Sequence, residues 1–401
     1  MGTIDPDTAA RIATPPAILE TARAIAERLR EGAAERDRER IYPHEQLGWI
    51  AESGLLGLLV PTEHGGHGGT YMDAVRVVEI LSEGDSCVGQ IFHVHNTGVE
   101  LCQQVVPEPL RSAWHERTVR DGLRWSNAYS ELAGKTIFNW QVRIAPDGDG
   151  FVLNGDKFYC TGSLGAGVFY VTAVLEGTED VKLVFLEPTT EGMEIVDDWD
   201  GMGQRCTGSG TIRFRNARVA AEQVCSLGDT TPPESLFGPL GQLSFSAIHM
   251  GIVRAAARDA QEYASTRARA WVHSGVDRAV DDPIVSLRFG ELRVLVSACE
   301  ALQERAIDLM GWSWLNPSAE SRGIASVATS EAKAFTTEAG LKVCEMLYQL
   351  CGSSATLAKY GYDRHWRNLR TMSLHDPADY KYKLIGDYYL TGNLPPVTAY
   401  T

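Results

Sequence analysis

One segment near the end of the sequence carries side chains suited to moving protons. His375 stands in Ser373-Leu374-His375-Asp376-Pro377, just before a predicted helix. Proline favours the first position of a helix, so Asp376 is predicted to be the N-cap, with its carboxylate bonded to backbone N–H groups. Such a carboxylate has a lowered pKa and is a poor general base. His375 is therefore the candidate acid–base group, and a histidine that only anchors the chain is the alternative.

His93 and His95 form a second candidate segment, on a helix predicted at 86–104. A spacing of two residues places them about 200° apart around the helix axis, so they are poorly placed to bind one metal ion together. At most one of them faces any given pocket, and the alternative is one solvated and one packing histidine. The eight cysteines are scattered without a C-x-x-C pair, and we expect neither zinc nor disulfides.

Small hydroxyl residues close the segment 154–163, inside a β-rich block of the sequence. Its Asn-Gly pair predicts a tight turn, and the residues that follow favour extended backbone. The segment ends in Thr161, Gly162 and Ser163. Small polar groups at a strand end allow a flat ligand to approach the backbone and receive hydrogen bonds. A hairpin with surface hydroxyls is the alternative.

Basic and small polar residues in the C-terminal half could meet an anionic group of a ligand. Gln349, Gly352 and Ser353 form a polar stretch at a predicted helix end, which a plain C-cap would also explain. Each arginine alone is typical of a solvated surface; the candidates are Arg267, Arg269, Arg364, Arg367 and Arg370. The sequence has no G-x-G-x-x-G motif at a strand-to-helix turn, so it does not predict a nicotinamide site.

The elements that must position these residues follow the order helices, strands, helices. Helical spacing of apolar residues predicts helices at 16–32, 43–53, 71–83, 86–104, 242–268, 283–312, 321–351 and 377–391. Apolar runs and alternation predict strands at 168–175, 181–186 and 211–219. The α+β order predicts a helical domain at 1–122, a β domain at 123–226 and a helical bundle at 227–401, with a linker at 227–236.

The overall composition is that of an ordinary globular protein. The chain has 401 residues, 44% hydrophobic content and a net charge of −15. That charge argues against nucleic acid and anionic membranes as partners, because both are bound through basic surfaces. The N-terminus shows no signal-peptide pattern and no apolar run is long enough for a membrane helix, so we expect a cytoplasmic protein.

Several segments, taken in order, resemble the acyl-CoA dehydrogenase superfamily over nearly the whole chain. Asn127–Glu131 resembles its flavin-contacting strand end, and Asn154–Thr161 resembles its N-G-x-K-x-W-I-T segment, with Tyr159 in the tryptophan position. Gly57–Pro61 and Gly203–Ser209 are similar to its N-terminal turn and its G-x-R-x-S-x-T strand. The resemblance implies an N-terminal helical domain, a central β-barrel or sandwich and a C-terminal four-helix bundle.

One departure from the dehydrogenases points to a branch of this superfamily. The glutamate of their Y-E-G-T stretch removes a substrate proton, whereas this sequence has His375-Asp376-Pro377-Ala378 there. With Arg267–Trp271 and Asp281–Pro283, this resembles the flavin-dependent two-component monooxygenases, such as dibenzothiophene and sulfone monooxygenases.

That branch implies a reaction and a set of partners. Its members take reduced FMN, with FAD as an alternative, from a separate NAD(P)H:flavin reductase. They react it with O₂ to a C4a-hydroperoxyflavin and oxygenate a small, aromatic or heteroatom-containing substrate. The alternatives are an acyl-CoA dehydrogenase or oxidase with Asp376 as base, and a non-catalytic scaffold that keeps the flavin fold.

The resemblance also implies roles for individual residues. The residues expected to line the isoalloxazine are Asn127, Ser130, Thr161 and Ser163, and Tyr159 and Gly162 are also expected to bind the cofactor. Arg267 and the stretch of Gln349, Gly352 and Ser353 are expected to meet the flavin phosphate from different subunits of a homotetramer, and Arg370 is also expected to bind the cofactor. Those expected to be catalytic are His375, with His93 or His95 opposite it, Thr161 and Ser163.

Overall fold

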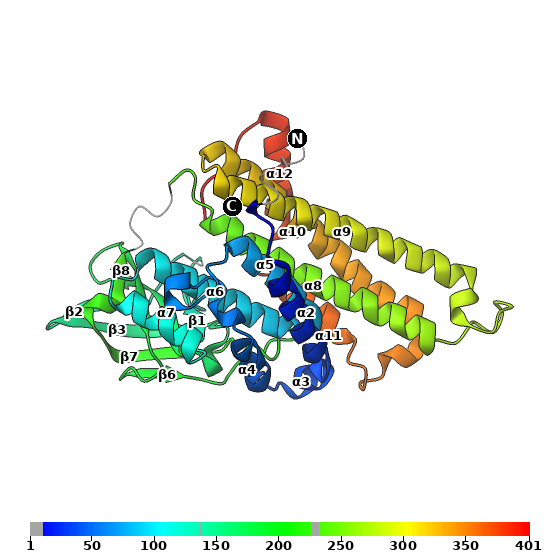
Figure 1. Cartoon of the computed structure of the whole chain (residues 1–401), viewed down its shortest axis with the longest axis horizontal. Helices are drawn as coiled ribbons and strands as arrows, with labels where there is room; N and C mark the ends of the chain where they lie inside the picture. The colour runs from blue at the N-terminus through cyan, green and yellow to red at the C-terminus, as the bar shows by residue number, and fades with distance from the viewer. Residues whose placement is uncertain (1–10, 137, 227–231) are drawn as a thin grey trace.

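The computed structural model of the chain describes residues 11–136, 138–226 and 232–401. The sequence-based linker at 227–236 falls partly outside these residues. Figure 1 shows a sheet beside a body of helices, in which the long C-terminal helices lie against the N-terminal ones. The α+β class predicted from the sequence is confirmed. No helix in the described part of the chain is long and apolar enough to cross a membrane.

The helices before the sheet agree with the apolar spacing of the sequence where that spacing is strong. They are α2 (Pro16–Arg30), α3 (Ala33–Glu39), α4 (His44–Glu52), α5 (Tyr71–Gly84), α6 (Ser86–Val105) and α7 (Leu110–Arg120). Helix α5 begins at a capping box in which Thr70 and Asp73 bond each other's backbone N–H groups. Asp85 caps α6 by accepting the N–H of Cys87 at 3.0 Å.

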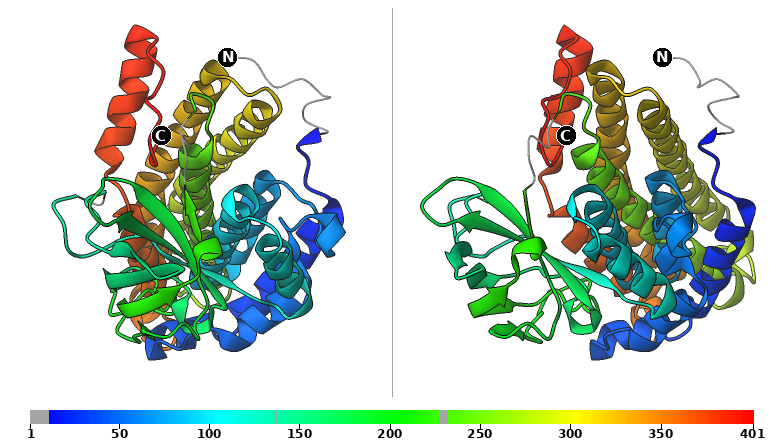
Figure 2. Two further views of the ribbon diagram at one scale, coloured as in Figure 1. Left: turned by 90° about the vertical axis from the view of Figure 1, so that its left-hand side faces the viewer. Right: turned by 60° about the vertical axis from the view of Figure 1, so that its left-hand side comes forward.

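The helices after the sheet are longer. They are α8 (Phe237–Thr266), α9 (Pro283–Leu315), α10 (Ala319–Cys351), α11 (Asp363–Ser373) and α12 (Ala378–Thr391). Asp282 caps α9 through the N–H of Ile284, with Pro283 in the first position. Ser318 caps α10 through the N–H of Ser321. Figure 2 shows α12, in red, lying beside α10 at the margin of the bundle, above the sheet.

The strands form one mixed sheet within residues 123–226. They are β1 (Trp125–Ala128), β2 (Arg143–Asp147), β3 (Gly150–Lys157), β4 (Val168–Leu175), β5 (Val181–Leu186), β6 (Met193–Ile195), β7 (Ile212–Val219) and β8 (Val224–Ser226). The order is β6-β7-β3-β2-β4-β5-β8, and β1 pairs with β4 in parallel. Because β1 packs against α6, the sheet meets the helices at this edge.

The Asn-Gly pair at 154–155 is not a tight turn, contrary to the sequence-based expectation. It lies inside β3, where the register against β7 shifts between Leu153 and Gly155. Gly155 has a φ of +129°, so the pair forms a bulge that glycine tolerates. Asp156 and Lys157 remain in β3, but the run from Phe158 to Thr161 that was expected to be extended lies outside the strand, and Tyr159 has a φ of +59°. This bend turns the chain from β3 towards Thr161.

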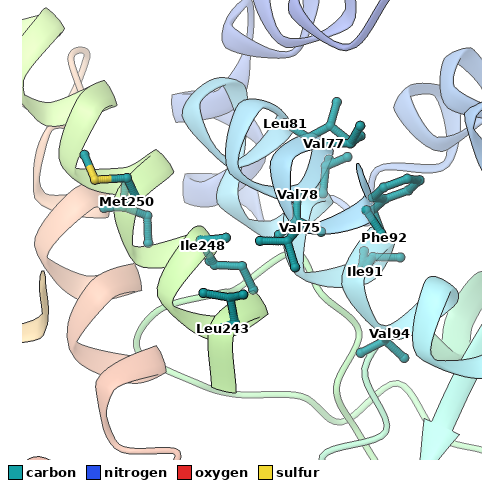
Figure 3. Packing of buried hydrophobic residues seen from close by; sticks show 14 of the residues in the cluster. Val75, Val77, Val78, Leu81, Ile91, Phe92, Val94, Leu243, Ile248 and Met250 are labelled. Atoms are coloured by element: carbon teal, nitrogen blue, oxygen red, sulfur yellow. The ribbon is translucent and has the colours of Figure 1, made fainter. Parts of the chain in front are cut away.

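One hydrophobic core joins the N-terminal and C-terminal helices. Figure 3 shows Val75 and Val78 of α5 facing Leu243 and Ile248 of α8. Gly251 of α8 allows the close approach, because a Cβ there would lie 2.6 Å from the carbonyl oxygen of α5 residue 79. The sheet has a second, smaller core. The helical segments on either side of the β block therefore form one packed body.

Candidate functional site

The hydroxyl groups singled out in the sequence lie together on the side of the sheet that meets α6. Thr161 Oγ1 and Thr207 Oγ1 each share a hydrogen bond with Ser209 Oγ, at 2.9 and 2.6 Å. The Ser163 hydroxyl donates to a backbone carbonyl of the facing loop at 2.8 Å. Gly162 has a φ of +84°, which suits glycine, and its N–H donates to Thr207 O. We call Thr161, Ser163, Thr207 and Ser209 the hydroxyl cluster.

A buried ion pair fixes the chain just after β1. Lys157 Nζ lies 2.6 Å from Glu131 Oε1, with both side chains almost fully buried, and also donates to Tyr129 O at 3.1 Å. Burial lowers the pKa of Lys157 to about 8, and Glu131 opposes this shift. The N–H of Phe158 donates to Ser130 O at 2.9 Å. Residues 129–131 are therefore held against the segment that leads to the hydroxyl cluster.

Two buried acceptors on the elements that contact the hydroxyl cluster lack a hydrogen-bond donor among the described residues. They are Asn127 Oδ1, on β1, and Gln90 Oε1, on α6. Ser126 donates to Thr161 O at 2.8 Å, and Gln90 Nε2 makes a long contact of 3.5 Å with Thr161 Oγ1. A buried acceptor is costly unless water or a ligand supplies a donor. Because the ring of a reduced flavin carries N–H groups, these acceptors fit such a ligand.

Helix α6 connects the hydroxyl cluster to the C-terminal histidine. Gln90 and His93 are three residues apart, so they share one helix face with Cβ atoms about 5–6 Å apart. The ring centroid of His93 lies 5.2 Å from that of Phe245 on α8, and Phe245 lies 4.0 Å from His375. Segments around residues 161, 93 and 375 therefore border one region between the sheet and the helices.

His95 is not brought to this region. It is 1% exposed, and its Nε2 lies 2.8 Å from Leu56 O while its Nδ1 accepts the N–H of Trp125 at 3.3 Å. Burial lowers the pKa of His95 to about 4, and the bond to Leu56 opposes this shift. Burial, together with His375, lowers the pKa of His93 to about 3. His95 therefore links α6 to β1, and His93 is the histidine that faces the site in a neutral form.

Asp376 does not cap α12, contrary to the sequence-based expectation. The helix begins at Ala378, and no side chain accepts a hydrogen bond at its start. Instead, Lys333 Nζ donates to Asp376 Oδ1, and Lys381 Nζ lies 3.0 Å from Oδ2. Burial would raise the pKa of Asp376, but His375 and the two lysines hold it well below its usual range. Asp376 is therefore a poor general base because of ion pairing rather than helix capping.

His375 keeps one edge of its ring open. Its Nδ1 lies 3.1 Å from Asp376 Oδ1, and 38% of its side chain is exposed. Partial burial lowers the pKa of His375; the bond to Asp376 opposes this shift and the charge of Lys333 adds to it. An ionised carboxylate can only accept, so Nδ1 carries the hydrogen. Neutral His375 consequently presents Nε2 as a proton acceptor.

A run of ring contacts leads from His375 back to the end of β1. The ring centroids of His375 and Tyr400 are 5.8 Å apart, and those of Tyr400 and Phe138 are 5.9 Å apart. Phe138 contacts Trp140 at 5.9 Å, and Trp140 contacts Tyr129 at 5.4 Å. All four contacts are edge-to-face, the arrangement that aromatic pairs favour. We call Tyr129, Phe138, Trp140 and Tyr400 the aromatic wall.

The residues expected at the flavin phosphate lie at the opposite end of the long helices. Arg267 follows α8, Gln349 is in the last turn of α10, and Gly352 and Ser353 come next. Figure 1 shows both helices ending on the same side of the molecule. Phe245 and Arg267 are separated by about 30 Å along α8. These residues therefore lie far from the region that Phe245 and His375 border.

Two of the other candidate arginines are held in ion pairs. Arg364 pairs with Asp259 at 3.1 Å, and Arg367 pairs with Asp37 at 2.5 Å, in both cases with a buried carboxylate. Arg370 is half-buried in the last turn of α11. Among the residues that the structure describes, no group of three histidines, cysteines or carboxylates could hold a metal ion.

Tyr159, the remaining candidate, lies among aromatic side chains at the surface. It is 48% exposed, and its ring centroid lies 4.8 Å from that of Phe158 and 5.9 Å from that of Trp199. Its backbone bend brings the following Thr161 into the hydroxyl cluster. Its ring partners differ from those of His375, which are Phe245 and Tyr400.

Comparison with known proteins identifies the family. The family model described as "Acyl-CoA dehydrogenase, N-terminal domain" matches residues 15–120, and the model described as "Acyl-CoA dehydrogenase, C-terminal domain" matches residues 243–380. Dibenzothiophene monooxygenase of Rhodococcus erythropolis is 32% identical over 391 residues, covering 93% of each chain. This chain belongs to the acyl-CoA dehydrogenase superfamily.

Further relatives place this acyl-CoA dehydrogenase superfamily member in the monooxygenase branch. The probable FMNH₂-dependent monooxygenase SfnC of Pseudomonas putida is 30% identical, over 98% of this chain and 100% of that protein. The structure of methanesulfinate monooxygenase MsuC from Pseudomonas fluorescens matches with a TM-score of 0.89 and 31% identity. That match covers 97% of this chain and 100% of the other. The resemblance inferred from the sequence is thus confirmed.

Sequence reasoning missed several side chains around the candidate site of this superfamily member. They are Gln90, Phe245, Lys333, Lys381 and Tyr400. Lys333 left one available signal, because it lies between Ala332 and Ala334 in a stretch of α10 that is rich in small residues. Nothing in the sequence pattern distinguishes Lys381 or Gln90 from a surface residue, since their roles depend on which helices pack together.

Proposed function

We propose that this protein is a two-component, FMNH₂-dependent monooxygenase. It takes reduced FMN from a separate NAD(P)H:flavin reductase, in a cytoplasmic setting, and uses O₂ to oxygenate a small organic molecule. The observation that carries this proposal is the state of the His375-Asp376 pair. The carboxylate near the position of the dehydrogenase base is occupied by two lysines, whereas the histidine beside it has an open proton-accepting edge.

The residues on the sheet side would hold the flavin ring. Asn127 and Gln90 offer buried acceptors for its N–H groups, and the hydroxyl cluster offers further polar contacts at the same edge. When bound, reduced FMN supplies the electrons that activate O₂, and one oxygen atom passes to the substrate. The aromatic wall would exclude water from this region, which strengthens the electrostatic interactions inside it.

The two histidines would control protons on the helix side. His375 Nε2 accepts a proton when the ring is neutral and returns it when water must form. His93, across Phe245, is held neutral by burial, so it adds no second positive charge to the site. The two rings therefore have different roles, since His375 moves a proton whereas His93 stays neutral.

The aromatic wall favours a flat, aromatic substrate over a small anion. One of its four rings, that of Tyr400, contacts His375, the others follow in a chain of ring contacts, and aromatic rings pack well in edge-to-face contacts. Among the relatives, one is named for dibenzothiophene and another for methanesulfinate, so both kinds of substrate occur in this branch. A product screen with reduced FMN, O₂ and either aromatic heterocycles or alkyl sulfinates separates the two classes.

Two other functions would give different results in simple assays. An acyl-CoA dehydrogenase with Asp376 as base would reduce an electron acceptor when given an acyl-CoA, and the lysines on Asp376 oppose this role. A non-catalytic scaffold would bind flavin without consuming O₂. An acyl-CoA assay tests the first alternative, and anaerobic binding followed by exposure to O₂ tests the second.

Reduced FMN is expected to bind more tightly than oxidised FMN, and FAD serves as the comparison ligand. The reason is that the orphan acceptors of Asn127 and Gln90 need N–H donors, which the reduced ring has in greater number. Anaerobic equilibrium titration of the protein with photoreduced FMN measures this directly. Absence of reduced-flavin binding would contradict the proposed function.

A matched pair of asparagine variants makes that titration specific. Asn127→Ala is expected to weaken reduced-FMN binding up to roughly tenfold, the effect of one neutral hydrogen bond. Asn154→Ala is the control, because Asn154 bonds Asn216 at the bulge between β3 and β7 and should leave binding unchanged. Equal affinities in both variants would remove Asn127 from the flavin site.

The long helices leave an apolar face that a second subunit would cover. Ile284, Leu287 and Val294 of α9 are 62%, 56% and 69% exposed and lie on one side of the helix. Contiguous exposed apolar residues of this kind mark interaction surfaces. Arg267 and the 349–353 stretch lie far from the region beside His375, so a homotetramer that brings this bundle end to the site of a neighbouring subunit would use both features.

Leu287→Glu combined with Val294→Glu is expected to dissociate the assembly, because two carboxylates would be buried in an apolar interface. Sedimentation velocity should change from a tetramer to smaller species, and reduced-FMN affinity should fall with it. Ser286→Glu is the control, since this exposed residue lies about 100° around the helix from Leu287. A wild-type monomer with tight flavin binding would contradict this assembly.

A further inference from the structure

Two buried lysines converge on the single carboxylate of Asp376. Lys333 of α10 and Lys381 of α12 are each 3% exposed. Lys333 Nζ also donates to Gln242 Oε1 of α8 at 2.6 Å, and Lys381 Nζ donates to Tyr400 O at 2.5 Å. One carboxylate thus ties together α8, α10, α12 and the segment that carries the ring of Tyr400.

The second lysine is more than charge balance requires. One ammonium group neutralises Asp376, so the second adds a net positive charge in a buried place, where an unbalanced charge is costly. If this contact between helices served stability alone, one lysine or apolar side chains would stabilise the fold better than two lysines. The excess charge lies next to His375, whose ring keeps an open edge.

The excess charge acts on His375 through two routes. By holding Asp376 ionised, the lysines keep the carboxylate as the acceptor for Nδ1–H of His375. By their own charge, they disfavour a second proton on the imidazole. The other ionisable groups facing these residues are His93 of α6, His249 of α8 and Tyr400, and burial keeps both histidines neutral. None of these three groups therefore offsets the positive charge.

We propose that Lys333 is a positioning residue: it holds the Asp376 carboxylate on Nδ1 of His375 and keeps the imidazole neutral, with Nε2 as a proton acceptor. Lys381 acts in the same direction from the other carboxylate oxygen. The reaction that this histidine serves rests on the proposed function, whereas its protonation state does not.

Lys333→Met tests the proposal, because methionine fills similar space without charge. Hydrogen–deuterium exchange at the C2 position of each histidine, followed by mass spectrometry over a pH series, gives the titration midpoint of His375. The midpoint is expected to rise by roughly one pH unit in Lys333→Met, because the carboxylate then acts on the ring with less opposing charge. Lys342→Met is the matched control: it is on the same helix, its side chain is 51% exposed and it pairs with Glu345.

A structural role alone would give a different pattern. Lys333→Arg keeps the charge and is expected to leave the His375 midpoint near the wild-type value, whereas a packing role would make arginine as disruptive as methionine. If Lys333→Met does not fold, Lys381→Met tests the same proposal by removing the ammonium group at the other carboxylate oxygen of Asp376. An unchanged His375 midpoint in the folded methionine variant would overturn the proposal.

The test separates this inference from the proposed function. In a working monooxygenase, the upward shift of His375 should also move the acid limb of product formation to higher pH and raise the fraction of O₂ released as peroxide. If the protein does not bind reduced FMN, the proposed function fails, but the exchange midpoint of His375 is still measured. If flavin binds and the midpoint does not move, only the positioning role of Lys333 is lost.

Discussion

Replacing His375 by alanine is expected to lower coupled product formation by roughly 10²–10³ in rate, the range of a lost catalytic proton donor or acceptor. Oxygenation yields water as well as product, so a group at the site must take up and return a proton. His375 Nε2 is an open proton acceptor in this region, since Nδ1 is bonded to Asp376, whereas His95 is engaged on both nitrogens. Flavin oxidation should continue without it, with peroxide replacing the oxygenated product.

Stopped-flow mixing of the reduced protein with O₂, with parallel peroxide and product assays, measures this change. His273→Ala is the control, because His273 lies in the exposed loop after α8 and contacts only the ring of Trp271 among the described rings. The product yield of that variant should equal the wild-type yield. Full coupling in His375→Ala would contradict a proton role for this histidine.

Asp376→Asn is expected to lower the free energy of unfolding by about 3–5 kcal/mol, the cost of removing one partner from a buried ion pair. The neutral amide leaves Lys333 and Lys381 buried without a carboxylate. A cap would have tolerated this change, because asparagine caps helices well. The N-cap predicted from the sequence would make Asp376→Asn a mild change, whereas the ion-pair geometry makes it strongly destabilising.

The loss of stability in Asp376→Asn should depend on pH in a defined direction. Buried lysines without a partner have pKa values below those in the unfolded chain, so stability rises with pH between the two values. The deficit of Asp376→Asn relative to wild type should therefore be smaller at pH 9 than at pH 7 in chemical unfolding. Asp387→Asn, which removes an exposed partner of Lys383 on the same helix, should change stability by less than about 1 kcal/mol. A pH-independent deficit would contradict the lysine explanation.

The fold was predictable where apolar spacing is strong. The expected strands at 168–175 and 181–186 match β4 and β5, and the expected helices at 71–83 and 86–104 match α5 and α6. Helices α3, α7 and α11 were missed because charged residues dominate them. In α11 the arginines that looked like surface charges bond carboxylates of other helices, which only the tertiary structure reveals.

The site was predictable only in part, for a related reason. His375 and Thr161 stand out because each lies next to a local signal: His375 comes just before a helix start, and Thr161 lies at a strand end. The partners of His375 come from α8, α10 and α12, and no local pattern pairs these helices side chain by side chain. The N-cap prediction for Asp376 failed because a carboxylate close to two ammonium groups gains more from them than from backbone N–H groups.

The core shared by α5 and α8 has a consequence for synthesis on the ribosome. Val75 and Val78 find their partners Leu243 and Ile248 only after some 165 further residues have emerged. At the usual speed of translation, that interval lasts roughly 10–30 s. During this time the apolar side of α5 lacks its partners from α8, and transiently exposed apolar surface of this kind favours aggregation. The strands of the sheet, by contrast, are all made within one contiguous stretch.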